Sequence, residues 1–103
     1  MIYNLSITEK AEKQLDELVN YLLFKFMNGQ AAAHLLDCVE KIYDLLEDNP
    51  FQFSPSKDPY LANIGYREAW LVDMKYRIIF SIEGNMVFVK GIFHELEKYQ
   101  YKL

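Results

Sequence analysis

The stretch KYRIIFSIEGNMVFVKGIF, Lys75 to Phe93, contains two segments rich in β-branched and aromatic residues that meet at Gly84-Asn85. Glycine adopts a positive φ without strain, so this pair suits a two-residue hairpin turn with glycine at its first central position. We therefore expect two antiparallel strands joined by a tight turn. Such a turn also fixes which residues oppose one another, because it pairs the residues directly before and after it.

The pairing that follows divides the predicted hairpin into a charged face and an apolar face. The opposed pairs are Glu83–Met86, Ser81–Phe88, Ile79–Lys90, Arg77–Ile92 and Lys75–His94. Directly opposed side chains lie on the same side of a sheet. The polar groups that share the charged face are Lys75, Arg77, Ser81, Lys90 and His94. The apolar face, which a core would cover, carries Tyr76, Ile78, Phe80, Ile82, Val87, Val89, Gly91 and Phe93.

Two further strands are expected outside this hairpin. The segment YREAWLV, residues 66–72, alternates with a period of two and predicts the strand before it. Asp73-Met74 is a poor two-residue turn, so the sequence leaves open which face Arg67, Glu68 and Trp70 occupy. At the N-terminus, MIYNLS predicts a short first strand.

Two amphipathic helices are predicted between the first strand and the last three. Apolar residues with helical spacing are Ala11, Leu15, Leu18, Val19, Leu22 and Phe26 in the first, and Leu35, Val39, Ile42, Tyr43 and Leu46 in the second. Ser6 and Glu9 have the spacing of a capping box. We therefore expect the first helix to begin near residue 7 or 8 and to end near Met27.

The second helix is bounded by residues that favour turns. Asn28–Gln30 supplies a glycine and a residue that tolerates the left-handed conformation. Asn49-Pro50 ends the helix, because proline disfavours helical geometry in the residue before it. The segment PFQFSPSKDPYLANIG, residues 50–65, holds all three prolines and is expected to form a loop anchored on the core by Phe51 and Phe53.

The order β-α-α-β-β-β is typical of an α+β domain in which a helical hairpin packs on one face of a small, twisted, mainly antiparallel sheet. At 103 residues, 51% of them hydrophobic, the chain is expected to form a single domain over residues 1–103. The one cysteine, Cys38, has no partner for an internal disulfide and is interpreted as a small core side chain.

Composition and motifs argue against several classes of function. The net charge of −4 disfavours a general affinity for nucleic-acid phosphates, although residues 57–103 alone carry +1. No apolar run reaches the length of about 20 residues that crosses a bilayer, and the N-terminus lacks signal-peptide features. We expect a cytoplasmic protein with no membrane partner. No His, Cys or carboxylate cluster has ligand spacing and no glycine-rich phosphate loop is present, so we expect no metal and no cofactor.

The end of the first helix, VNYLLFKFM, is apolar almost all round. The residues in excess of one core stripe are Tyr21, Leu23, Phe24 and Met27. Such a surplus is typical of a partner surface. Two alternatives remain open: the loop of residues 50–65 covers these side chains, or the patch mediates self-association into a homo-oligomer.

The chain resembles the RelE/ParE superfamily of bacterial type II toxin–antitoxin toxins over essentially its whole length. The features that carry the resemblance are the order of the elements, Tyr76-Arg77-Ile78, the Gly84-Asn85 turn, the segment MVFV, His94 and Tyr99. The resemblance implies a toxin that inhibits growth and is neutralised by a small cognate antitoxin. An amphipathic antitoxin helix would then lie on the surplus apolar residues of the first helix.

Members of this superfamily divide by mechanism. RelE-like toxins cut mRNA in the ribosome, whereas ParE-like toxins act on DNA gyrase without nuclease chemistry. In a nuclease, the resemblance implies that Arg77 contacts the scissile phosphate and that His94 and Tyr99 take part in catalysis. Metal-independent RNA cleavage needs a base, an acid and a cation, so Lys75 or Lys90 would supply a second positive charge.

The acidity of the chain favours the ParE-like mechanism. A sequence pI near 5.1 suits a protein wedged into ribosomal RNA poorly. Glu95 and Glu97 also follow His94, in a tail that cleaving members tend to fill with basic residues. We therefore expect inhibition of DNA gyrase, with a ribosome-dependent mRNA endonuclease as the alternative and an inactive homologue that acts as a binding module as the third reading. In the gyrase reading, the charged face is a docking face.

Overall fold

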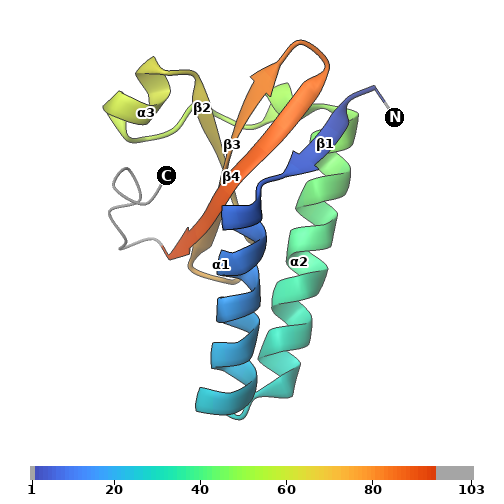
Figure 1. Cartoon of the computed structure of the whole chain (residues 1–103), viewed down its shortest axis with the longest axis vertical. Coiled ribbons are helices and arrows are strands. Elements are labelled where there is room, and N and C mark those ends of the chain that lie inside the picture. The colour runs from blue at the N-terminus through green and yellow to red at the C-terminus, as the bar shows by residue number, and fades with distance from the viewer. Residues whose placement is uncertain (1, 95–103) are drawn as a thin grey trace.

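Residues 2–94 are described by the computed structural model, and in this part of the chain a helical hairpin packs on a four-stranded sheet (Figure 1). The elements are β1 (Asn4–Ile7), α1 (Glu9–Asn20), α2 (Gly29–Asp48), α3 (Pro59–Asn63), β2 (Tyr66–Trp70), β3 (Tyr76–Glu83) and β4 (Met86–His94). A π-helical turn, Tyr21–Lys25, continues α1, and a 3₁₀ turn, Pro50–Gln52, follows α2.

The sheet is mixed, with strand order β1-β4-β3-β2. β1 runs parallel to β4, and the other neighbouring pairs are antiparallel. The predicted α+β fold and element order are confirmed. One short helix, α3, was not predicted: Asp58 caps it by accepting hydrogen bonds from the backbone N–H groups of Tyr60 and Leu61, and Pro59 occupies its first turn.

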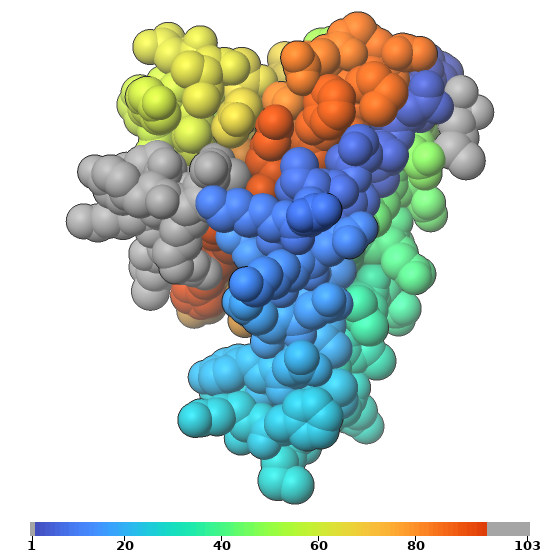
Figure 2. All heavy atoms as spheres, in the orientation of Figure 1, coloured from blue at the N-terminus to red at the C-terminus, as the bar shows by residue number. Residues whose placement is uncertain are grey.

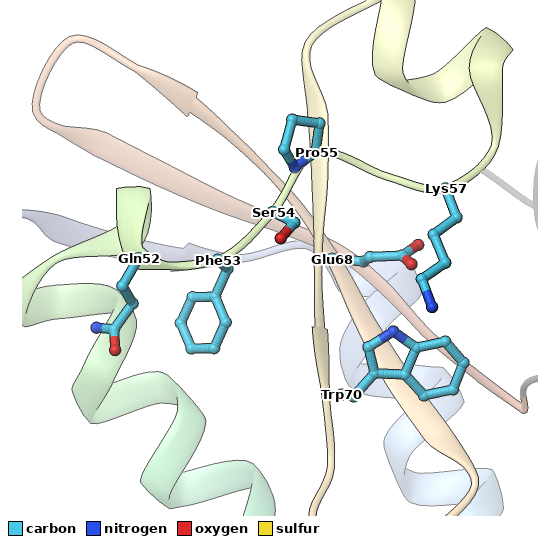
Figure 3. Close-up of a pocket in the computed structure, with 7 residues that line it drawn as sticks. All are labelled: Gln52, Phe53, Ser54, Pro55, Lys57, Glu68 and Trp70. Carbon is cyan, nitrogen blue, oxygen red and sulfur yellow. The ribbon is translucent and has the colours of Figure 1, made fainter.

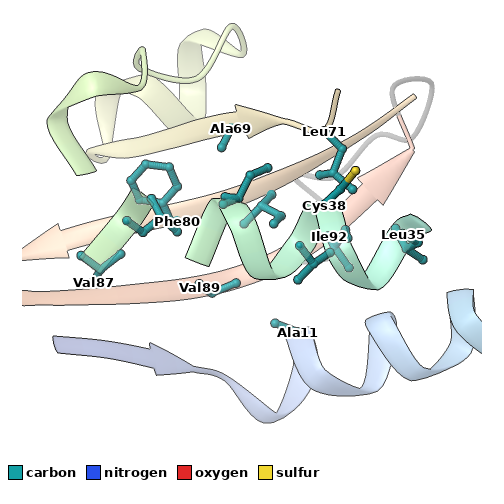
Figure 4. Packing of buried hydrophobic residues seen from close by; sticks show 13 residues of the cluster. Ala11, Leu35, Cys38, Ala69, Leu71, Phe80, Val87, Val89 and Ile92 are labelled. Carbon is teal, nitrogen blue, oxygen red and sulfur yellow. The ribbon is translucent and has the colours of Figure 1, made fainter. Parts of the chain in front are cut away.

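The helices α1 and α2 cover one face of the sheet, called the helix face below. Figure 4 shows the core between these helices and the sheet. Its buried members are Ala11, Leu35, Cys38, Val39, Ile42, Leu46, Ala69, Leu71, Ile78, Phe80, Val87, Val89 and Ile92. Burial of Cys38 confirms its interpretation as a core side chain. The predicted helical stripes therefore point inward as expected, apart from the end of the first.

The hairpin turn is confirmed close to its tip. Gly84 has φ +61, Glu83 pairs with Met86, and Ser81 pairs with Phe88. Beyond Phe80 the register changes, because Phe80 opposes Val89 while Ile79 opposes Gly91. Lys90 is thus the extra residue of a β-bulge on β4.

The bulge makes the predicted pairing wrong from Ile79 onward. Ile78 opposes Ile92, Arg77 opposes Phe93, and Tyr76 opposes His94. Because side chains alternate along a strand, one extra residue moves every later side chain of β4 to the other face. Ile92 therefore joins the core, whereas Gly91 and Phe93, predicted on the apolar face, lie on the opposite one.

Packing of α1 on β4 accounts for the bulge. β1 pairs with β4 only as far as Val89. The backbone N–H of Ile92 then donates to Gln14 Oε1 at 3.0 Å, so a side chain of α1 replaces the missing strand partner. A Cβ on Gly91 would lie 2.7 Å from that oxygen and 2.5 Å from the Phe93 ring, so this position requires glycine.

Two predicted details of the helical half are wrong. Thr8, not Ser6, caps α1: its Oγ1 accepts a hydrogen bond from Ala11 N at 3.1 Å, while Ser6 pairs with Phe88 in the sheet. Phe26 was expected in the core but is 62% exposed. The π-helical turn adds a residue to the last helical turn, which rotates Phe26 away from the stripe.

The segment after α2 lies against the sheet rather than against the end of α1 (Figure 1). Phe53 packs on Phe80, with ring centroids 6.0 Å apart, as predicted. Phe51, the other expected anchor, is 54% exposed, although its ring meets that of Tyr3 at the edge of the fold. On the far side of the sheet, Leu61 of α3 packs with Ile79 and Phe93 in a second, smaller core cluster.

Candidate functional site

The face of the sheet opposite α1 and α2, called the outer face, carries an unusual number of buried polar groups. Its side chains come from β2, β3 and β4 and include Tyr66, Glu68, Trp70, Arg77, Ile79, Ser81, Phe88, Lys90 and Phe93. Glu68, Arg77 and Ser81 are all buried there, as is Ser56 beside them. Buried polar side chains are costly unless they are paired, so they mark this face as more than a solvated surface.

Trp70 organises one end of the outer face. The guanidinium carbon of Arg77 lies 4.9 Å from the centroid of the Trp70 ring. The ammonium of Lys57 lies 5.5 Å from the same ring. Both cations are within the distance at which the electron-rich face of an indole attracts positive charge. Trp70, which pairs with Arg77 across β2 and β3, therefore holds two cations at one aromatic side chain.

Beside Trp70 lies a pocket of about 220 Å³ lined by Gln52, Phe53, Ser54, Pro55, Lys57, Glu68 and Trp70 (Figure 3). Glu68 is 4% exposed, and its Oε2 accepts a hydrogen bond from Ser56 Oγ at 3.2 Å. In Figure 3 its carboxyl group points toward Lys57 and Trp70. This part of the outer face thus joins a buried carboxyl group, an indole and a lysine.

Lys90 forms a second group of cation and aromatic rings. Its ammonium lies 5.4 Å from the Phe88 ring centroid and 5.8 Å from that of Tyr66. Tyr66 pairs with Ser81, which lies on the same face of β3 as Arg77. Lys90 packs over Tyr66, so the prediction that Arg77 and Lys90 share a face is confirmed. Arg77 itself is only 6% exposed, so its positive charge lies beneath the surface of the outer face.

The other members of the predicted charged cluster lie elsewhere. His94 lies on the helix face, where its ring meets that of Tyr76 edge-on at 5.6 Å. Its expected position beside Arg77 is therefore wrong, and the bulge at Lys90 is the reason. Lys75 precedes β3 and is exposed, and His94 opposes Tyr76 in the sheet instead of the predicted Lys75. Tyr99 lies outside the described residues.

The tip of the helical hairpin is a second candidate site. The tip patch consists of exposed apolar side chains at Tyr21, Leu23, Phe24, Phe26 and Met27, the last two 62% and 85% exposed. It projects away from the sheet at the end of α1 (Figures 1 and 2). The loop of residues 50–65 lies at the sheet end of the molecule, so the interpretation that it covers this patch is wrong.

Local backbone geometry presents these side chains. Phe26 N donates to Tyr21 O at 3.2 Å, and Asn28 N donates to Leu22 O at 2.9 Å, so the helix widens before it ends. Met27 adopts φ 50, an uncommon conformation for this residue type. Asn28 Oδ1 then accepts from Ala31 N and starts α2. π-helical turns and strained residues are frequent at functional sites, which agrees with the exposure of the tip patch.

Sequence reasoning missed the roles of Ser56, Lys57, Glu68 and Trp70. The face of Glu68 and Trp70 depends on the connection between β2 and β3, where Asp73 adopts φ 63 and Leu71 N donates to Tyr76 O. Aspartate tolerates the left-handed conformation, so Asp73 was a usable turn signal. The same geometry puts Arg67 on the helix face, where it donates to Phe53 O.

The described part of the chain contains no group of three metal-ligating side chains. Among its helices, none combines the length and apolar character needed to cross a membrane.

Comparisons with known proteins agree with this architecture. A family model described as ParE toxin of type II toxin-antitoxin system, parDE, matches residues 5–99. A solved structure titled "Chromosomal ParDE TA system from P. aeruginosa" aligns with a TM-score of 0.71 and 20% sequence identity, covering 90% of this chain and 96% of that chain. At this identity the likeness shows the fold. No curated protein sequence matches significantly.

Proposed function

Because the chain belongs to the ParE toxin family of type II toxin–antitoxin systems, we propose that it inhibits DNA gyrase without cutting RNA and that a cognate antitoxin neutralises it. Its growth-inhibiting surface is the outer face. Its antitoxin-binding surface is the tip patch.

The separation of Arg77 from His94 is the observation that carries the non-nucleolytic reading. Cleavage of RNA without a metal needs a general base, a general acid and a cation around one phosphate. Arg77 lies on the outer face, whereas His94 lies on the helix face beside Tyr76. The imidazole and the guanidinium therefore do not converge on one phosphate.

The outer face has the composition of a protein-docking surface. Tryptophan, tyrosine and arginine are enriched among the residues that dominate binding energy at protein interfaces. Trp70 is 37% exposed and rests against the buried Arg77, which restricts its motion. In this reading Trp70 contacts gyrase directly, and Arg77 is a positioning residue.

The tip patch suits an amphipathic antitoxin helix. Phe24 and Met27, at 77% and 85% exposed, offer apolar side chains of the kind that such a helix covers. Tyr21 and Phe26 meet edge-on at 4.9 Å and give the patch a firm aromatic base. Binding here would bury apolar surface that the monomer leaves in water.

The target is tested by measuring supercoiling of plasmid DNA by purified gyrase in the presence of the purified toxin. We expect inhibition by the wild-type chain. Trp70→Ala should need about 30-fold more protein for the same inhibition, the size of effect typical of an interface hot spot. Lys13→Ala, an exposed residue of α1 outside both surfaces, is the matched control and should behave as wild type. Full supercoiling at all wild-type concentrations would reject gyrase as the target.

The alternative is a RelE-like, ribosome-dependent mRNA endonuclease. Arg77 and Lys90, both on the outer face, are the observation in its favour, since two cations can bind a phosphate. New mRNA ends in cells that express the toxin would support this reading. An absence of any growth effect would instead favour an inactive homologue that retains only partner binding.

A further inference from the structure

The pocket beside Trp70 contains a buried carboxyl oxygen that accepts no hydrogen bond from residues 2–94. Glu68 Oε2 accepts a hydrogen bond from Ser56, but Glu68 Oε1 is buried without a hydrogen-bond partner in the described part of the chain. Native proteins leave few such atoms unpaired, and each one calls for an explanation. An acceptor held ready for the donors of a ligand is one explanation, because Glu68 lines the pocket.

Lys57 and Trp70 flank this carboxyl group. Lys57 is exposed, and its ammonium lies over the Trp70 ring. In Figure 3 the side chain of Lys57 lies beside the Glu68 carboxyl group, with its nitrogen toward the Trp70 ring. An exposed lysine changes rotamer easily, so Lys57 can move away from the Trp70 ring and leave that face of the ring to a ligand.

The size of the pocket restricts what it can hold. Its volume of about 220 Å³ is below the range of about 300–1,000 Å³ found for drug-sized ligands. A single flat group fits such a space better than a whole nucleotide or a folded peptide. The group must bring hydrogen-bond donors to Glu68, an acceptor to Lys57 and a planar surface to Trp70.

We propose that this pocket binds a guanine base. Guanine carries two adjacent donors, the ring N1–H and the exocyclic N2 amino group, which match one carboxylate. Its O6 accepts a hydrogen bond from a lysine ammonium, and its ring stacks on tryptophan, as bases do in proteins that read unpaired nucleotides. Adenine presents an unprotonated N1 to the same carboxylate and is rejected.

A guanidinium group matches the pocket less well. It would donate to Glu68 and stack on Trp70, but it would add a third positive charge beside Lys57 and Arg77. Guanine is neutral and uses Lys57 as a partner. The base can belong to a free nucleotide or to a single-stranded nucleic acid, and both present the same edge.

The single tryptophan of the chain gives a direct assay, since stacking of a base on Trp70 quenches its fluorescence. Guanosine monophosphate should quench the emission saturably, and adenosine monophosphate should bind at least about tenfold more weakly, the cost of one unmatched hydrogen bond to a charged group. Inosine monophosphate, which lacks the N2 amino group, should fall between them. Equal quenching by the adenine and guanine nucleotides would overturn the proposal.

Two short RNAs distinguish the source of the base. A nine-residue oligouridine with one central guanosine is compared with uniform oligouridine. Guanine-dependent quenching by the RNA and by the mononucleotide assigns the pocket to the base alone. Quenching by the RNA only assigns it to a base within a strand. Both results support a guanine pocket, and quenching by neither contradicts it.

Variants separate recognition from folding. Glu68→Gln should weaken binding of guanosine monophosphate by about tenfold or more, because its amide N–H₂ opposes the N2 amino group. Lys57→Ala, a surface change that leaves the buried carboxyl group in place, should weaken it less, and Lys13→Ala should not alter it. Circular dichroism and thermal unfolding check the fold of each variant.

A strong response to arginine amide that depends on Glu68 would replace guanine with a cationic side chain as the ligand. The supercoiling assay is independent of these titrations, so the failure of either proposal can be recognised without the other.

Discussion

The tip of the helical hairpin exposes apolar side chains, whereas the outer face of the sheet buries polar ones. Phe24 and Met27 are 77% and 85% exposed, while Glu68 and Arg77 are 4% and 6% exposed. When a partner covers an exposed apolar surface, the free energy of the system falls, because apolar area leaves water. A surface of the second kind already depends on its own internal contacts, so its polar groups affect stability as well as binding.

The largest effect expected from this comparison is on partner binding at the tip. Phe24→Asp combined with Met27→Asp should weaken antitoxin binding by about 100-fold or more, because two charges would enter an apolar interface. The midpoint of thermal unfolding should change little, since neither side chain is buried. Isothermal titration with the cognate antitoxin measures the loss.

Val72→Asp is the matched control for the tip, because Val72 is 72% exposed and lies outside it. Antitoxin affinity of this variant should equal that of wild type. Analytical sedimentation of the wild-type chain tests the alternative that a second copy of the chain covers the tip patch. A dimer that the tip variant dissociates would assign the patch to self-association.

The next largest effect is on the stability of the bulge that separates the two faces of β4. Gly91→Ala should lower the free energy of unfolding by about 1–3 kcal/mol, the usual cost of overpacking. The reason is that its Cβ would lie 2.5 Å from the Phe93 ring and 2.7 Å from Gln14 Oε1. Urea denaturation gives the value.

Gly29→Ala is the control for the bulge, because a Cβ there would meet only Leu23 at 4.0 Å. Its unfolding free energy should stay close to wild type. If Gly91→Ala were equally neutral, the packing account of the bulge would be wrong.

A smaller effect distinguishes the two hydroxyl groups that precede α1. Thr8→Ala should cost about 1 kcal/mol of stability, because Thr8 Oγ1 caps the helix. Ser6→Ala should cost less, since Ser6 lies in β1 and makes no cap. The same urea denaturation compares them, and a larger loss for Ser6→Ala would restore the capping box predicted from the sequence.

The last effect is confined to alkaline solution. Burial, with a contribution from the charge of Glu12, raises the pKa of Tyr43 from 10.0 to about 12. The folded state then holds a proton that the unfolded state has lost, so this contribution to stability is present below pH 10 and disappears as pH rises toward 12. Tyr43→Phe should make the unfolding free energy less dependent on pH in that window. An unchanged alkaline slope would contradict the shift.

Local patterns predicted much of this fold. The Gly84-Asn85 turn and the helical stripes depend on neighbours in sequence, and both form as expected. The bulge at Lys90 depends on Gln14, which is 78 positions from its hydrogen-bond partner Ile92. No periodicity within β4 could reveal that contact. This single distant interaction is what moved His94 to the other face.

The candidate site was predictable in the same uneven way. Exposure of Tyr21, Leu23, Phe24 and Met27 followed from an apolar surplus over one helix stripe, which the sequence displays directly. The pocket around Glu68 required the strand parity set at Asp73 and the path of residues 54–57. Both depend on the folded chain. Sequence patterns alone indicate only the turn at Asp73.

The most direct test of the central claim, that the outer face docks a protein rather than cutting RNA, is mRNA 5′-end mapping in cells that express the wild-type chain alongside a DNA-damage reporter. Growth arrest with induced DNA damage and no new mRNA ends is the predicted result. New mRNA ends that disappear in the Arg77→Ala variant and also in the separate His94→Ala variant would contradict it. Side chains on opposite faces of the sheet would then act at one phosphate.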